Sequence, residues 1–114
     1  MAYDEHLAGR VRDLVHAQSG YDEKKMFGGI CFLLHGHMAC GVVKDDLMVR
    51  VGPEDQSDAL ALPHARPMDF TGKPMKSMIY VAPDGLVSDT DLEAWVRRGL
   101  AFTATLPPKK PKGV

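Results

Sequence analysis

The side chains that could do chemistry gather in one apolar stretch, MFGGICFLLHGHMACGVV, at positions 26–43. It holds both cysteines of the chain, Cys31 and Cys40, and two of its five histidines, His35 and His37. Thiolate and imidazole groups bind zinc, and a cysteine activated by a base can act as a nucleophile. The pattern therefore raises two possibilities: a metal or redox site, or only two buried strands of a small sheet.

The spacing favours strands. A zinc site needs three or four convergent ligands, but His35 and His37 flank a turn residue and neither cysteine belongs to a CxxC motif. Burial in apolar runs raises the pKa of a thiol and lowers its reactivity. We therefore predict no catalytic, cofactor-binding or metal-ligating residues. The alternative is a small enzyme or ligand-binding protein with a pocket near Cys31, Cys40, His35 or His37.

A two-residue turn at 35–36 would fold the stretch into a hairpin with strands near 27–34 and 37–43. Regular pairing then places Cys31 opposite Cys40 at a non-hydrogen-bonded position, with Cα atoms about 4.5 Å apart. A disulfide accepts Cα separations of about 4.4 to 6.8 Å. The cysteines are thus a possible thiol pair, which we expect to stay reduced in a reducing cytoplasm.

The elements around the hairpin predict an α+β domain with a small antiparallel sheet. An apolar stripe at helical spacing predicts an N-terminal helix over 3–18. A third strand is expected near 47–51, a short helix over 53–62 and a fourth strand near 78–82. Ser88 and Asp91 resemble a capping box at the start of a C-terminal helix over 89–103.

The segment between the short helix and the fourth strand, PHARPMDFTGKPMKS, has three prolines and is expected to be irregular. We interpret residues 1–105 as a single domain, because the chain of 114 residues has the length of one domain. Residues 106–114, LPPKKPKGV, are expected to form a flexible tail rich in proline and lysine.

Both faces of the predicted sheet are apolar, although an antiparallel sheet usually leaves one face to water. The two long helices can cover one face. The other face then needs the short helix, the irregular segment or a second subunit. We therefore predict an interaction surface at Phe32, Leu34, Met48 and Arg50, used for a homodimer or for another protein partner.

Composition narrows the class of protein. A net charge of −1 gives no strong electrostatic footprint for nucleic acid. Nucleic-acid contact through Arg10, Arg12, Lys24, Lys25 and the lysines of the tail is a weaker possibility. The first residues show no secretory signal, and no apolar stretch is long enough to span a bilayer. We expect a cytoplasmic protein without membrane association.

The sequence KMFGGICFLLHGHMACGVVKDDLMVRVGPE resembles the N-terminal domain of the TfoX (Sxy) family. The pattern is Met-Phe-Gly-Gly at the start of a strand, a glycine turn at Gly36, and an acidic turn before a strand that ends near a basic residue. The later MDFTGKPMKSMIYVAP and the helix that contains Trp95 extend the resemblance over residues 3–103.

This resemblance implies an α+β domain without established enzymatic activity and provides no catalytic residues or cofactor. Full-length members of the family regulate natural competence genes together with other transcription factors. Those members also carry a C-terminal helical domain, which these 114 residues do not include. The resemblance therefore implies a non-enzymatic binding or regulatory module that acts through protein–protein contacts.

Overall fold

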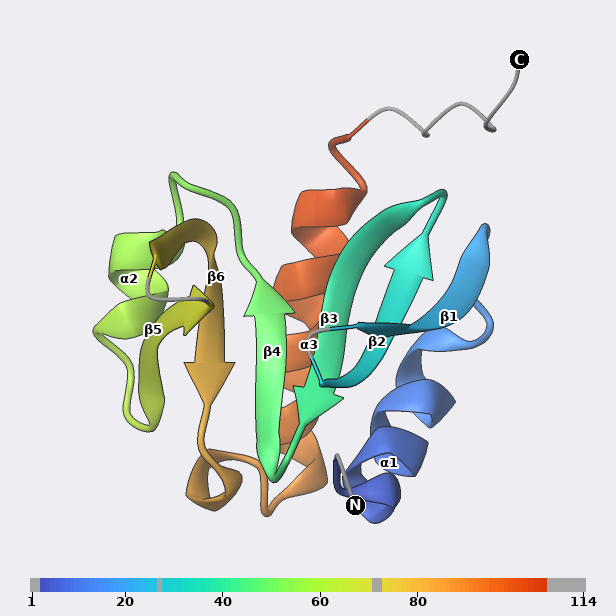
Figure 1. The fold of residues 1–114 in the computed structure, drawn as a ribbon, viewed down its shortest axis with the longest axis horizontal. Coiled ribbons are helices and arrows are strands. Elements are labelled where there is room, and N and C mark those ends of the chain that lie inside the picture. The colour runs from blue at the N-terminus through green and yellow to red at the C-terminus, as the bar shows by residue number, and fades with distance from the viewer. Residues whose placement is uncertain (1–2, 27, 71–72, 107–114) are drawn as a thin grey trace.

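The computed structural model describes residues 3–26, 28–70 and 73–106. It confirms the α+β class: a six-stranded antiparallel sheet packs against three helices (Figure 1). The elements in chain order are α1 (Glu5–Val15), β1 (Tyr21–Met26), β2 (Gly29–Leu34), β3 (His37–Val43), β4 (Asp46–Arg50), α2 (Gln56–Leu60), β5 (Ala65–Phe70), β6 (Lys73–Val81), a 3-10 turn (Pro83–Gly85) and α3 (Asp89–Thr103). From residue 107 onward the predicted tail lies outside the described residues.

The sheet has the strand order β1-β2-β3-β4-β6-β5. The four predicted strands are present, and the structure adds β1, where no strand was predicted, together with β5 and the first half of β6 in the segment expected to be irregular. β1 is an edge strand whose side chains are half exposed and half only partly buried, so its polar sequence YDEKKM lacks the apolar signal of a buried strand. Pro67 in β5 is compatible with an edge position, where a missing N–H donor breaks no ladder between two neighbours.

The helices follow their capping residues. Ser88 Oγ accepts a hydrogen bond from the Asp91 backbone N–H at 3.0 Å, and α3 spans the predicted range 89–103. Helix α1 is shorter than the predicted 3–18, because Asp4 caps its first turn and it ends at Val15. Helix α2 is a helix of five residues inside the predicted 53–62.

One face of the sheet carries the main core, and the helices pack on it. In Figure 1 the helices lie behind the sheet, which is seen from its other face. Side chains from α1 and α3 interdigitate with those of β2, β3, β4 and β6, and α2 adds Ala59. Among the most buried are Val11, Phe32, Val42, Leu47, Val49, Ile79, Leu92 and Val96.

The hairpin of β2 and β3 has the predicted two-residue turn, in which His35 has φ +52° and Gly36 has φ +86°. Regular pairing stops after Leu33, because Phe32 pairs with Cys40 and leaves Ala39 as an extra residue in β3. This is a β-bulge, which reverses the alternation of the faces beyond it. The predicted pairing of Cys31 with Cys40 is therefore wrong: Cys31 lies opposite Gly41.

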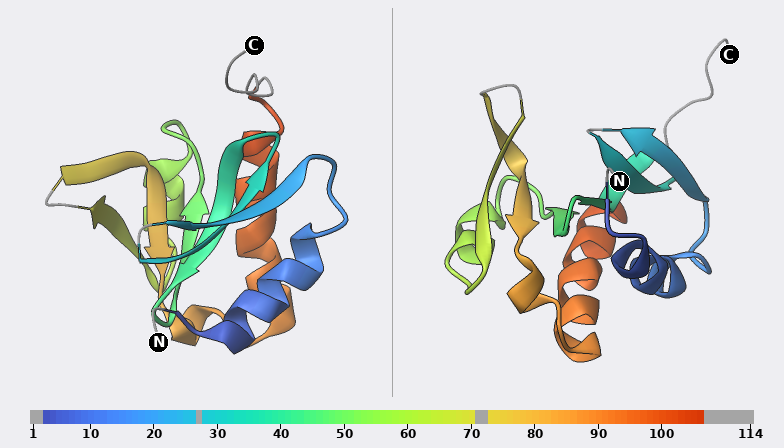
Figure 2. Two further views of the ribbon diagram at one scale, coloured as in Figure 1. Left: turned by 45° about the vertical axis from the view of Figure 1, so that its right-hand side comes forward. Right: turned by 60° about the horizontal axis from the view of Figure 1, so that its bottom comes forward.

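The second face of the sheet carries a smaller cluster of buried and half-buried side chains. Among the described side chains, the cluster takes residues from all six strands and includes five methionines: Met26, Cys31, Leu33, Met38, Val43, Met48, Met68, Met78 and Tyr80. In the right-hand view of Figure 2, both ends of the sheet bend away from the helices. The sheet therefore curls around this cluster, whose flexible thioether side chains can fill an irregular space.

Candidate protein-binding groove

The structure separates the two cysteines. Cys40 belongs to the core on the helix side of the sheet, whereas Cys31 belongs to the methionine-rich cluster on the other side. Both are buried free thiols. Burial raises the pKa of Cys31 to about 11 and that of Cys40 to about 12, with a smaller contribution at Cys40 from the neighbouring Cys31. Neither thiol has the exposure or the lowered pKa of a nucleophile.

The histidines of the hairpin do not build a metal site. His35 is exposed in the turn, and His37 is half-buried at the start of β3. Among the described residues, no group of three or more His, Cys, Asp or Glu side chains is placed to hold a metal ion. No helix of that part of the chain is long and apolar enough to cross a membrane.

The predicted interaction surface is not one surface. Phe32 is 1% exposed and lies on the helix side, whereas Met48 is fully buried in the methionine-rich cluster. The alternation that placed them on one face was wrong because of the bulge at Ala39. Leu34 and Arg50 are half-buried. The Arg50 guanidinium lies 5.5 Å from the centre of the ring of Phe102, a residue that lines a hollow beside α3.

Two of the residues considered for nucleic-acid contact are engaged within the molecule. Arg10 pairs with Asp89 at 3.1 Å, and the Arg12 guanidinium pairs with the Glu23 carboxylate. Lys24 and Lys25 are exposed on β1. These contacts neutralise much of the positive charge on this side of the molecule, which weakens the case for a phosphate-binding surface.

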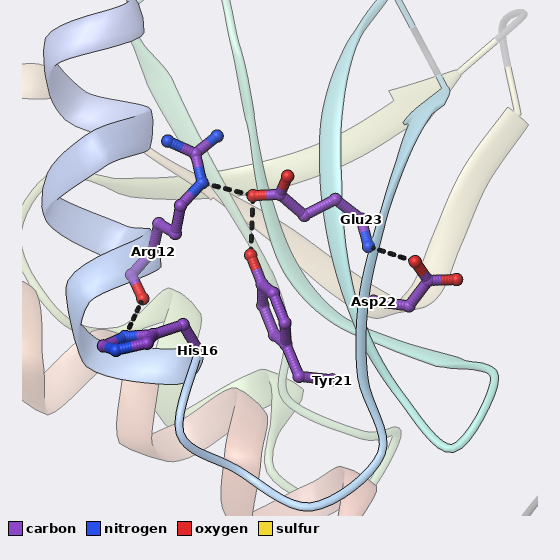
Figure 3. Close-up of polar contacts among 5 residues, drawn as sticks. All are labelled: Arg12, His16, Tyr21, Asp22 and Glu23. Carbon is purple, nitrogen blue, oxygen red and sulfur yellow. Dashed lines mark hydrogen bonds and ion pairs between the residues drawn. The ribbon is translucent and has the colours of Figure 1, made fainter.

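The Arg12–Glu23 pair joins α1 to the edge strand β1 (Figure 3). Tyr21 donates a hydrogen bond to the same Glu23 oxygen at 2.6 Å, and its ring stacks on Phe32 at 6.5 Å. Burial, followed by the bond to Glu23 and its negative charge, raises the pKa of Tyr21 to about 12. Desolvation raises the pKa of Glu23, but the hydrogen bonds from Tyr21 and Arg12 outweigh it and the net shift is downward. We interpret this cluster as a structural clamp.

A groove runs along α3, and we call it the α3 groove. It consists of two hollows of about 380 Å³ and about 560 Å³ that meet at Arg98. The residues that α3 contributes are spaced by three and four, so they form one face of the helix. They are Asp91, Ala94, Trp95, Arg98, Ala101 and Phe102, with Thr105 just beyond the end of the helix. The segments 51–55, 62–64 and 84–85 line the rest.

Arg98 connects the two walls of the groove. Its guanidinium pairs with Asp55 at 2.9 Å and lies 5.4 Å from the centre of the Trp95 ring. The ion pair holds the segment before α2 against α3, and the cation–π contact places the guanidinium over the Trp95 ring. The groove thus has a fixed bridge at its centre, and its two ends are open.

Local backbone geometry shapes both ends of the groove. Gly52 has φ +86°, and a Cβ atom there would lie 2.5 Å from the Phe102 ring, so only glycine allows this close approach. At the other end His64 has φ +71°, and its carbonyl accepts a hydrogen bond from the Ala82 N–H at 2.9 Å. Positive φ at a residue other than glycine costs free energy, so it persists only where the surrounding contacts require it.

The charge of the groove is predominantly negative. Four carboxylates line it, and Asp55 is the one that Arg98 neutralises. Glu54, Asp84 and Asp91 provide the excess negative charge. The apolar lining comes from Trp95, Phe102 and their neighbours, which include Leu62, 38% exposed, and two prolines, Pro53 and Pro63. An aromatic floor with carboxylates at its rim suits an extended, positively charged segment of polypeptide.

Sequence reasoning missed this groove. No expectation drawn from the sequence concerned a hollow beside the C-terminal helix, whose apolar stripe includes Trp95, 7% exposed and part of the main core. The charged residues that flank this stripe were the one available signal. The opposite wall could not be predicted, because the position of residues 51–55 and 62–64 depends on how the segment around α2 packs against α3.

A known protein family accounts for most of this chain. The model of the TfoX N-terminal domain matches residues 13–103, and the chain belongs to this family. The matched range extends from within α1 to the last residue of α3, so it includes both walls of the α3 groove. No curated protein and no solved structure matches the chain.

Proposed function

We propose that this TfoX N-terminal domain is a non-enzymatic regulatory module that binds a partner protein through the α3 groove. The observation that supports the proposal is the combination of an apolar floor, in which Phe102 is half-buried and Trp95 is 7% exposed, with the acidic residues Glu54, Asp84 and Asp91. Both cysteines are buried free thiols, and within the described ranges no three His, Cys, Asp or Glu side chains are grouped to hold a metal ion.

The partner that suits this groove is a basic segment that contains proline. Proline-rich segments adopt the extended polyproline II conformation and bind in grooves lined by aromatic side chains, with little loss of conformational entropy. Lysines placed between the prolines would pair with the carboxylates at the rim. Ion pairs at such exposed positions contribute specificity and about 0.5 kcal/mol each.

The test is titration of the full chain with the synthetic peptide Pro-Pro-Lys-Lys-Pro-Lys, followed by NMR. We expect shifts of the Trp95 indole N–H and of the amides of Ala94 and Ala101, and weaker binding as salt increases. The double variant Asp84→Asn, Asp91→Asn removes two ion pairs, so its Kd for the peptide should be higher, by at most about fivefold.

The matched control is the double variant Asp13→Asn, Asp45→Asn, which changes the net charge by the same amount at exposed positions outside the groove. Its Kd should equal that of the original chain. Equal weakening by both double variants would mean that binding is a general effect of net charge and would contradict the proposal. Peptide shifts confined to β1 and α1 would place the site elsewhere, with the same consequence.

A further inference from the structure

The sequence contains a segment with the chemistry that the groove suits. Residues 107–112 read PPKKPK and combine three prolines with three lysines. They follow directly after Thr105 and Leu106, and Thr105 itself lines one end of the groove. We propose that residues 107–112 fold back along α3 and occupy the α3 groove of the same molecule, so that a partner must displace them. This inference rests on the proposed function of the groove.

The lengths agree. From Asp91 to Thr105 the groove face of α3 rises by about 21 Å, at about 1.5 Å per residue. Six residues in polyproline II conformation extend over about 19 Å, at about 3.1 Å per residue. A reversal of the chain at residue 106 would therefore bring the last lysine, Lys112, to the end of the groove that Asp84 and Asp91 line.

The positive charge of the segment also matches the negative charge of the groove. The groove has three carboxylates beyond the one that Arg98 neutralises, and the segment has three lysines. Because the segment is tethered beside the groove, its effective concentration there is high, and weak ion pairs are sufficient for partial occupancy. Helix α3 ends at Thr103, before the proposed reversal at residue 106, so the reversal breaks no hydrogen bond within the helix.

Occupancy in the same molecule predicts competition. If the segment fills the groove in about four-fifths of the molecules, the apparent affinity for an external peptide is about fivefold lower than the intrinsic affinity. The triple variant Lys109→Glu, Lys110→Glu, Lys112→Glu reverses the charge of the segment. It should therefore bind the synthetic peptide Pro-Pro-Lys-Lys-Pro-Lys about fivefold more tightly than the original chain.

A spin label on residue 113, introduced as Gly113→Cys in the full chain, tests whether the segment 107–112 lies in the groove. Cys31 and Cys40 are buried with raised pKa values, so labelling near neutral pH should modify residue 113 alone, which mass spectrometry verifies. We expect broadening of the Asp91 and Ala94 amide signals, loss of that broadening in the triple variant, and no broadening of Lys24 on β1.

Each result has one interpretation. Sharp Asp91 and Ala94 signals, the same as in the triple variant, would overturn the inference. Broadening found only between molecules, in a mixture of isotope-labelled and spin-labelled chains, would assign the segment to a second copy and also overturn it. If the external peptide binds in the groove while the spin label has no effect there, the proposed function stands and only the intramolecular occupancy fails.

Discussion

Tyr21 shows how one hydroxyl group links α1, β1 and the core. Its ring stacks on Phe32, while its hydroxyl and the guanidinium of Arg12 share one oxygen of Glu23 (Figure 3). The hydrogen bond favours the protonated phenol, and partial burial disfavours the phenolate. The side chain thus acts in the clamp only while it is protonated.

The protonated state of Tyr21 predicts that the free energy of unfolding depends on pH. The folded protein holds the Tyr21 proton up to a pKa of about 12, whereas an unfolded tyrosine releases it near pH 10. Between these values the folded state binds more protons than the unfolded state, so the free energy of unfolding falls as pH rises. Urea unfolding at pH 9 and pH 11 should show a smaller fall for Tyr21→Phe than for the original chain.

The same substitution at Tyr3 is the matched control, because it removes a tyrosine hydroxyl and leaves the Tyr21–Glu23 hydrogen bond in place. An equal fall of stability in the original chain and in Tyr21→Phe would show that the hydroxyl does not contribute to the clamp.

At the scale of elements, helix α3 approaches the sheet closely at the bulge of β3. A Cβ atom added at Gly99 of α3 would overlap the carbonyl oxygen of Ala39, the extra residue of β3. Since this contact involves backbone on the sheet side, no side-chain rotation can relieve it. The bulge and the helical glycine therefore form one packing unit.

Gly99→Ala should consequently destabilise the protein by about 1 to 3 kcal/mol, although alanine is the better helix former. Gly9→Ala in α1 is the matched control, because a Cβ there would meet no atom within 4 Å. It should stabilise the protein by up to about 1 kcal/mol. Chemical denaturation of both variants measures the difference, and stabilisation by both would contradict the described packing of α3 on β3.

The elements that sequence reasoning predicted are those with a local signal. Helix α3 has a serine cap, and β2, β3 and β4 have apolar runs separated by turn residues. β1 was missed because an exposed edge strand has no apolar pattern, and β5 because Pro67 indicates a loop unless the edge position is known. The bulge at Ala39 was missed because the residues themselves do not show where a ladder skips one position, and this reversed the faces assigned to Cys31 and Phe32.

At the scale of the whole molecule, the methionine-rich cluster ties the two ends of the sheet together. Met26 of β1 and Met68 of β5 belong to it, although these strands lie at opposite edges of the sheet. Met68 is fully buried despite its place in an edge strand. The curl of the sheet therefore contributes to global stability, in addition to the packing of the helices.

Met68→Ala should destabilise the whole protein by about 2 to 5 kcal/mol, the range for loss of a buried methionine side chain. Val87→Ala, at a position with a 78% exposed side chain, should change stability by less than about 0.5 kcal/mol. Urea unfolding followed by Trp95 fluorescence compares the two. A small effect of Met68→Ala would mean that β5 unfolds separately from the rest.

The two outer strands also bear on how the protein behaves at high concentration. An open sheet can recruit further strands from other molecules and grow into a fibre. Here Pro67 removes a donor from one outer strand, and the exposed Lys24 and Lys25 would repel a second copy aligned with the other. The proline and lysines that made β5 and β1 hard to predict as strands therefore also oppose polymerisation of the protein at high concentration.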